Sequence, residues 1–234
     1  MAPGSHPGLF ITLEGGEGSG KSTQARALVA RLRAEGPTVC ATEEPMGTPL
    51  GRAIKGLFER EAPSRSREPG SDEVIVSDWA ELFLFEAARA QHVRDVIRPA
   101  LERKEIVICD RFADSTTAYQ GYGRGLDLQE VENCNSIATG GLLPDLTLLF
   151  DIDPEIGLKR AVKAAQSGDA LRKASDSIGE ETLDFHERVR EGFLAIARAN
   201  PDRFVVIDAA QPMAAVEKSV RDAADGLLAR STLR

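Results

Sequence analysis

The chain has 234 residues, 42% hydrophobic and 28% charged, a composition typical of a globular domain. Its net charge of −8 disfavours a nucleic acid or an anionic membrane as the main partner, because both attract clustered lysine and arginine. Three widely spaced cysteines indicate neither a disulfide framework nor a metal site, and the chain shows no membrane span and no export signal, so we expect a cytoplasmic protein.

Short apolar runs alternate with helical patterns along the chain. The predicted strands cover 9–14, 38–42, 105–110, 145–152 and 203–208. The predicted helices cover Lys21–Glu35 and 78–98, one begins at Pro154, one ends near Ala199, and the last begins at Pro212. Such alternation predicts a five-stranded parallel sheet with helices on both faces, a three-layer α/β/α fold. We expect one domain over 1–234 with a loose N-terminus over 1–8, and surface loops or flaps at the polar stretches 60–73 and 163–181.

The sequence GGEGSGKS directly follows the first predicted strand and opens the first predicted helix. It satisfies G-x-x-x-x-G-K-[ST], the phosphate loop whose main-chain amides surround a polyphosphate. Lys21 is expected to reach the β and γ phosphates, and the metal ligands for Mg²⁺ are expected to be Ser22 and Asp110. The predicted ATP-binding residues are Gly15, Gly16, Glu17, Gly18, Ser19, Gly20, Lys21, Ser22 and Thr23.

The third predicted strand ends in Cys109-Asp110-Arg111. Motor and ABC-type ATPases would have Asp-Glu there to polarise water, and a GTPase would need an N-K-x-D sequence, which this chain lacks. An arginine at the carboxyl end of a strand lies where ligands bind in open α/β folds, and its planar fork suits a phosphate. Arg111 therefore predicts a phosphate-bearing acceptor.

Blocks spanning almost the whole chain resemble bacterial thymidylate kinase: EGGEGSGKST (14–23), EPMGTPL (44–50), LFLFEAARAQ (82–91), DRFADSTTAYQGYGRG (110–125), PDLTLLFDIDPEIGLKRA (144–161) and IDAAQP (207–212). The block at 110–125 is the most specific. The resemblance implies a P-loop kinase fold with a lid over 163–181, transfer of the ATP γ-phosphoryl group to dTMP with Mg²⁺, and a homodimer.

The resemblance also implies roles for individual residues. The catalytic set is Lys21, Arg111, Glu17, Arg160 and Arg172, where Arg111 holds the dTMP phosphate and the last two are cations from the lid region. In the dTMP site, Glu17 meets the deoxyribose 3′-OH, Phe85 stacks on thymine and Arg89 bonds the thymine O4. The other dTMP-binding residues are Glu44, Pro45, which often follows a cis peptide in this family, Ser115, Thr116 and Gln120.

The chain departs from the family pattern at several positions. Gly18 replaces a phosphate-loop arginine found in one subclass, Ser177 replaces a lid arginine, and Glu43 and Met46 differ from many relatives. Phe85 could instead be a core residue and Arg89 a solvated charge. Tyr119 and Trp79 are interpreted as packing residues, and His6, His92 and His186 as surface or helix residues. The alternatives are a kinase for another nucleotide or nucleoside, with Glu44 as base, and a non-catalytic ATP-binding paralogue.

Overall fold

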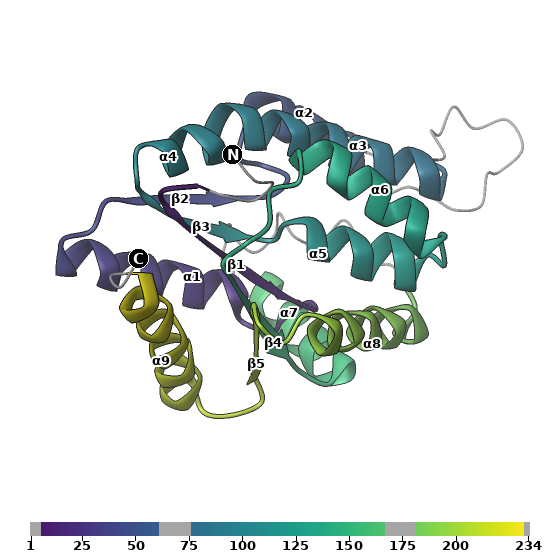
Figure 1. Cartoon of the computed structure of the whole chain (residues 1–234). Coiled ribbons are helices and arrows are strands. Elements are labelled where there is room, and N and C mark those ends of the chain that lie inside the picture. The colour runs from purple at the N-terminus through teal and green to yellow at the C-terminus, as the bar shows by residue number, and fades with distance from the viewer. Residues whose placement is uncertain (1–5, 61–75, 167–180, 232–234) are drawn as a thin grey trace, which may run out of the picture.

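Five parallel strands form the centre of the computed structural model, which describes residues 6–60, 76–166 and 181–231 (Figure 1). Their order across the sheet is β2-β3-β1-β4-β5, so the first strand of the chain is the central one. The five-stranded parallel sheet predicted from the sequence is thus confirmed. The strands are β1 Leu9–Gly15, β2 Val39–Glu43, β3 Ile106–Asp110, β4 Leu146–Asp151 and β5 Phe204–Asp208.

Alternate side chains of the strands pack on opposite faces of the sheet. Ile11 and Leu13 join a buried cluster with residues of α1 (Lys21–Glu35) and α9 (Met213–Ser231). Phe10 points to the other face, into a cluster with residues of the helical segments between β2 and β3. Figure 1 shows α1 and α9 on one side of the sheet and α3, α4 and α6 on the other. The three-layer arrangement is the one that apolar alternation predicts.

The remaining helical segments surround these two faces. They are α2 Pro49–Arg60, α3 Asp78–His92, η1 Val93–Ile97, α4 Arg98–Glu102, α5 Ala113–Thr116, η2 Thr117–Gly123, α6 Leu128–Thr139, α7 Pro154–Gln166 and α8 Leu183–Ala199. The sequence analysis did not predict α2, whose buried Ile54 and Phe58 pack against Ala88 of α3. The helical run predicted to end near Arg98 continues to Glu102, because the π-helical turn η1 places Pro99 at the start of a new helical turn, where its missing N–H is tolerated.

Parts of the expected loops lie outside the described residues. These are 61–75, 167–180 and, within the expected loose N-terminus, 1–5. Residues 163–166 of the expected lid belong to helix α7, and Gly8 at the N-terminal end is buried against Leu101 and Glu105. Across the described ranges, none of the helices is both long and apolar enough to cross a membrane.

Strand register brings three strand ends to one edge of the sheet. Leu13 of β1 lies opposite Asp110 of β3, and Gly15 lies opposite Phe150 of β4. The segments that follow these strands therefore meet at the carboxyl edge beside the central strand. This is the edge at which ligands bind in open parallel sheets.

Candidate functional site

The segment between β1 and α1 makes the sharp turn that its glycines predict. The backbone angle φ is +140° at Gly15, +66° at Gly18 and +90° at Gly20, a left-handed range that residues with a Cβ atom rarely adopt. Gly20 is the N-cap of the 15-residue helix α1. The free amides at the start of this helix therefore lie at the carboxyl end of the central strand, where they can bind an anion.

Lys21 is the first residue of α1, and its side chain is 6% exposed. Its Nζ donates to the carbonyl oxygen of Gly16 at 2.8 Å and to Ser19 Oγ at 3.5 Å. Burial, helped by the positive charge of Arg111, lowers the pKa of Lys21 to about 8, although Glu17 opposes this shift. The ammonium group is thus held against the loop with too little negative charge around it, and a phosphate would supply that charge.

The first turn of α7 packs directly on this loop. A methyl group added at Gly18 would overlap the carbonyl group of Gly157, and one added at Gly157 would overlap the carbonyl oxygen of Glu17. The larger side chain that some relatives are expected to carry at position 18 therefore has no space here without a shift of α7 or the loop.

Replacing Gly18 with alanine is expected to raise KM for ATP and to lower the unfolding temperature. The left-handed backbone costs alanine about 1–2 kcal/mol, and the overlap with Gly157 costs about 1–3 kcal/mol more. Together these predict a decrease of roughly 4–20 °C for a chain of this size. Thermal unfolding and ATP titration measure both effects.

The matched control is Gly226→Ala in α9, where an added methyl group meets no atom within 4 Å. It is expected to stabilise the protein by about 0.5–1 kcal/mol, because alanine favours helix interiors over glycine. Unchanged stability and KM in the Gly18 variant would contradict the close contact between the loop and α7.

Arg111 follows β3 and reaches across to the phosphate loop. Its main-chain N–H donates to the carbonyl oxygen of Leu13 at 3.0 Å, and its φ of +69° is a left-handed value that costs a non-glycine residue about 1–2 kcal/mol. One guanidinium nitrogen donates to Glu17 Oε1 at 2.7 Å. The other lies 3.5 Å from the carbonyl oxygen of Gly15 and 3.3 Å from Ser115 Oγ. The side chain is therefore aimed at the loop that contains Lys21.

The carboxylate of Glu17 is the centre of a three-residue contact that the sequence analysis found only in part. Burial opposes its ionisation, but the charges of Arg111 and Lys21 outweigh burial and hold the pKa of Glu17 below its usual value. Tyr119, interpreted from the sequence as a packing residue, does pack on Phe185, yet its hydroxyl donates to Glu17 Oε1 at 3.0 Å and accepts from Arg111 at 3.3 Å. Tyr119 therefore contacts two residues of the candidate site, a connection that the sequence analysis missed.

Arg89 is buried within a polar network instead of being a solvated helix charge. Its side chain is 4% exposed; Nε donates to Glu44 at 2.9 Å, and one terminal nitrogen donates to Thr116 at 2.9 Å, to Asn135 at 3.1 Å and to Glu86. Burial disfavours the charged form, but the two carboxylates outweigh it and raise the pKa of Arg89. Arg89 and Thr116, both predicted to bind dTMP, thus lie together, and Asn135 joins them.

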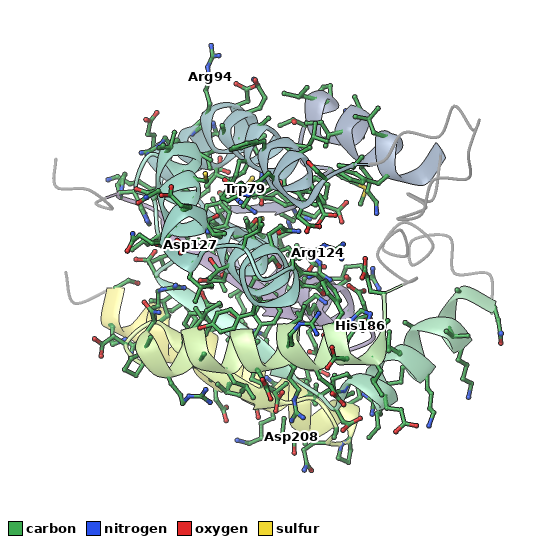
Figure 2. The ribbon with its side chains drawn as sticks, turned by 90° about the vertical axis from the view of Figure 1, so that its right-hand side faces the viewer. Trp79, Arg94, Arg124, Asp127, His186 and Asp208 are labelled. Carbon is green, nitrogen blue, oxygen red and sulfur yellow. The ribbon has the colours of Figure 1, made fainter. Side chains whose placement is uncertain are left out.

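The side chains of Phe85 and Gln120 both contact other residues of the protein. The ring of Phe85 stacks on Phe58, with centroids 5.2 Å apart and an interplanar angle of 9°, and Phe85 is only partly buried. Gln120 donates to Glu81 at 2.7 Å, and the carboxylate of Glu81 also accepts from Arg124, the residue labelled in Figure 2. Phe85 therefore combines the core contact with partial exposure of its ring.

The peptide bond between Glu44 and Pro45 is cis, as the family pattern implies. Glu44 is 7% exposed on its side chain, and both oxygens are engaged: one by Arg89 and the other by His92 Nδ1 at 3.1 Å. His92 is the last residue of α3, as the helix interpretation expects, but it is fully buried and not on the surface, and its Nε2 contacts Thr42 Oγ1 at 2.6 Å.

The residues expected to hold Mg²⁺ offer oxygen atoms at the same edge. Ser22 is exposed at the start of α1, and Asp110 ends β3 opposite Glu43 of β2. Burial and then the charge of Asp110 raise the pKa of Glu43. Among the described residues, no three His, Cys, Asp or Glu side chains form a metal site. Hydroxyl and carboxylate oxygens fit Mg²⁺, which takes much of its coordination from phosphates and water.

Of the two expected lid cations, Arg160 lies within the described residues and Arg172 does not. Arg160 lies on α7, is exposed, and donates to the carbonyl oxygen of Ala209, which follows β5, at 2.9 Å. Its recorded hydrogen bond therefore does not join it to Lys21 or Arg111. Arg172 and Ser177 lie outside the described residues.

A cavity of about 20 Å³ lies between the phosphate loop, β4 and α8. Its lining includes Gly16, Glu17 and His186, and His186 lies on α8 (Figure 2). His186 is a helix residue, one of the two alternatives that the sequence suggested, but it is buried at 5% exposure, and among the described residues its Nε2 has no hydrogen-bond partner. Burial lowers its pKa, which keeps the ring neutral near pH 7.

Comparisons with known proteins agree with this geometry. The family model described as thymidylate kinase matches residues 13–220. The chain is 49% identical over 213 residues to a thymidylate kinase of Solidesulfovibrio magneticus, covering 91% of this chain and 96% of the relative. It is 48% identical to a thymidylate kinase of Deinococcus radiodurans, and the match covers 91% of this chain and 94% of the relative. The crystal structure of thymidylate kinase from Ehrlichia chaffeensis matches with a TM-score of 0.70 and 32% identity over 95% of this chain and 99% of that one.

Proposed function

The chain belongs to the thymidylate kinase family, and we propose on this premise that it transfers the γ-phosphoryl group of ATP to dTMP, giving dTDP and ADP. The observation that carries the proposal is the pairing of two anion-binding groups across one strand end. Lys21 lies on the phosphate loop, and Arg111 extends from the neighbouring strand to the same loop. Each would hold one of the two phosphates that react.

The chemistry requires positioning and charge neutralisation. A phosphate monoester is mostly dianionic at neutral pH, because its second pKa is about 6, so its oxygen can attack without a general base. The bond from that oxygen to the γ phosphorus forms while the bond to the β-phosphate oxygen breaks, and ADP leaves. Lys21 and the loop amides would stabilise the donor phosphates, and Arg111 the acceptor. Mg²⁺, held by Ser22 and Asp110 with the phosphates, would neutralise charge on the transferring group.

The same edge of the sheet offers groups for the nucleoside of dTMP. We assign Glu17 to the 3′-hydroxyl, the ring of Phe85 to the thymine face and Arg89 to the thymine O4, with Ser115, Thr116 and Gln120 lining the pocket. Glu44 and Pro45 complete this set, with Glu44 acting by holding Arg89. The support for these assignments is the partial exposure of Phe85 and the network that joins Arg89 to Thr116.

Cations from the lid region would complete the phosphoryl-transfer site. We propose Arg160 and Arg172 for this role. Arg160 would have to exchange its bond with Ala209 for a phosphate contact. The exposure of Arg160 would leave its side chain room to change partners.

A nucleoside kinase is the alternative that the site disfavours. Such an enzyme needs a base for the acceptor hydroxyl, and the sequence offered Glu44. Its two oxygens are already bonded to Arg89 and His92 in a buried position. A coupled assay of ADP release with dTMP, dUMP, CMP, AMP and thymidine tests the assignment. We expect dTMP to give the highest kcat/KM, and equal rates with CMP or thymidine would reject it.

We also propose a homodimer and a cytoplasmic location. Large apolar side chains are exposed on the layer formed by α2, α3 and α6, among them Leu57 (57%), Phe83 (56%) and Ile137 (82%). A second copy of the chain would cover such side chains. Cys40, Cys109 and Cys134 are all free thiols, which is typical of a reducing compartment.

A further inference from the structure

A buried carboxyl group, that of Glu14, is hydrogen-bonded to the segment that follows Arg111. Glu14, the second-last residue of β1, is completely inaccessible to solvent. Its Oε1 accepts a hydrogen bond from the main-chain N–H of Phe112 at 2.7 Å, and its Oε2 accepts one from Ser115 Oγ at 2.6 Å. Both oxygens of Glu14 are thus bonded to the segment that begins with Arg111.

The bond to Ser115 determines what that hydroxyl offers to Arg111. A serine hydroxyl has one proton. Because Ser115 donates this proton to Glu14, its oxygen is left to accept from the Arg111 guanidinium, which lies 3.3 Å away. The hydrogen bonds therefore run from Arg111 to Ser115 and from Ser115 to Glu14. This donor order depends on a carboxylate at position 14 that accepts the serine proton.

The bond to Phe112 holds the main chain next to Arg111. The N–H of Arg111 is bonded to Leu13 and the N–H of Phe112 to Glu14, so two successive amides are tied to β1. Between these bonds, Arg111 adopts its left-handed φ of +69°. A strained backbone conformation persists only where neighbouring contacts hold it in place. The hydrogen bonds of the Arg111 and Phe112 amides to β1 provide such contacts.

We propose that Glu14 is a positioning residue for Arg111, which it aims at the acceptor phosphate by clamping the Phe112 amide and orienting the Ser115 hydroxyl. This inference rests on the proposed function, since it concerns the same phosphate site. Glu14 itself touches no substrate in this assignment.

The protonation state of Glu14 makes this role dependent on pH. Burial, with the charge of Asp114 adding to it, raises its pKa to about 8, while Ser115, Arg111 and Phe112 oppose the rise. Lys21 of α1 and the buried thiol of Cys109 in β3 also interact electrostatically with Glu14. Since the pKa is raised in the fold, the protein loses stability as pH rises toward and through about 8, where the carboxylate gains its charge.

Replacing Glu14 with glutamine distinguishes a role in orienting Arg111 from a role in stabilising the fold. The amide nitrogen of glutamine would donate to Ser115 Oγ and compete with Arg111 for that oxygen, so Arg111 would lose its orientation. However, the variant never carries the buried charge. It is therefore expected to keep or raise the unfolding temperature above about pH 8, whereas a residue with a purely structural role would lower that temperature when it is changed.

The test compares wild type, Glu14→Gln and Asp145→Asn. Asp145 is the matched control, because its Oδ2 accepts from the main-chain N–H of Phe10 at 2.8 Å at the opposite end of β1. At pH 9, where wild-type Glu14 carries its charge, we expect Glu14→Gln to raise KM for dTMP about tenfold or more, the effect of one charged hydrogen bond, with KM for ATP within about twofold of wild type at the same pH. In wild type, KM for dTMP should fall between about pH 7 and pH 9, and this dependence should vanish in Glu14→Gln. Asp145→Asn should leave both constants unchanged.

A double variant tests the route through the hydroxyl. In a Ser115→Ala background the effect of Glu14→Gln should shrink, since part of it acts through Ser115. Fully additive effects, an unchanged KM for dTMP, or an equal rise of both KM values with a lower unfolding temperature would each overturn the inference. If wild type does not phosphorylate dTMP, the proposed function fails instead. If Glu14→Gln does not fold, Ser115→Ala alone should show the dTMP-specific rise in KM, and its absence would count against the proposal.

Discussion

Arg111→Ala is expected to lower kcat/KM for dTMP about ten-thousandfold while KM for ATP changes little. A guanidinium that binds a phosphate in a water-poor site contributes about a thousandfold to a hundred-thousandfold in phosphoryl transfer. The variant also leaves the carboxylate of Glu17, 9% exposed, without its main counter-charge. Steady-state kinetics with each substrate varied in turn measure the expected loss.

Three further variants separate the possible causes of that loss. Arg111→Lys keeps the charge but not the planar fork, and it is expected to recover about a tenth to a hundredth of the activity. Arg111→Gly should be as inactive as Arg111→Ala but more stable by about 1 kcal/mol, because glycine relieves the left-handed φ of +69°. Arg203→Ala, which removes a buried pair with Asp114 away from the loop, should lose stability and retain kcat/KM. Near-normal activity in Arg111→Ala would contradict the assignment of the acceptor phosphate to this residue.

Lys21→Met is expected to lower kcat about a thousandfold, roughly 4 kcal/mol of transition-state stabilisation. The methionine keeps the length and apolar stem of lysine but carries no charge to the donor phosphates. Because only the protonated lysine stabilises these phosphates, kcat/KM for ATP in the wild type should decline as pH rises above about 8, where Lys21 loses its proton. The pH profile of the residual activity in the variant should lack this decline.

The same variant should be more stable than the wild type near pH 7. The pKa of Lys21 is depressed from an ordinary value of 10.5 to about 8, so the fold disfavours its charged form below about pH 8. This difference corresponds to roughly 3 kcal/mol at most. Thermal unfolding at pH 7 and pH 10 tests the sign, since most of the advantage of Lys21→Met should be lost by pH 10, where Lys21 is neutral in the fold and the unfolded chain approaches its own pKa of 10.5. An inactive variant that is also less stable at pH 7 would indicate a structural role for Lys21.

The sequence predicted the sheet and the first helix well because their signals are local. Helix α1 runs over Lys21–Glu35 as expected, since glycines bound it on both sides, and each strand is a short apolar run. Helix α2 was missed because Gly51 and Gly56 weaken its helical pattern. Its buried positions Ile54 and Phe58 have a partner only once α3 is in place. A signal that depends on tertiary packing is not visible in a single segment.

The sequence identifies candidate site residues that lie within motifs and misses those that come together from distant parts of the chain. Lys21 and Arg111 lie within motifs, but Tyr119 reaches Glu17 across 102 positions of the chain. Periodicity places Tyr119 and His92 on helices and says nothing about what their polar atoms contact. Glu14 was missed for another reason. It lies in an apolar strand, in which it is the one charged residue. A charged residue in a strand expected to be buried was the available signal.

The pairing of Glu17 with Arg111 has a consequence for which anions the site retains. Without a nucleotide, each of the two groups is the other's counter-ion, at 2.7 Å. Inorganic phosphate could satisfy the guanidinium, but it would place a second negative charge beside a buried carboxylate. A nucleoside monophosphate brings, on the same molecule, a hydroxyl that can donate to that carboxylate. The ion pair is therefore expected to disfavour simple oxyanions, because a ligand must offer both a phosphate to Arg111 and a hydroxyl to Glu17. Part of the selectivity for a nucleotide would then be independent of its base.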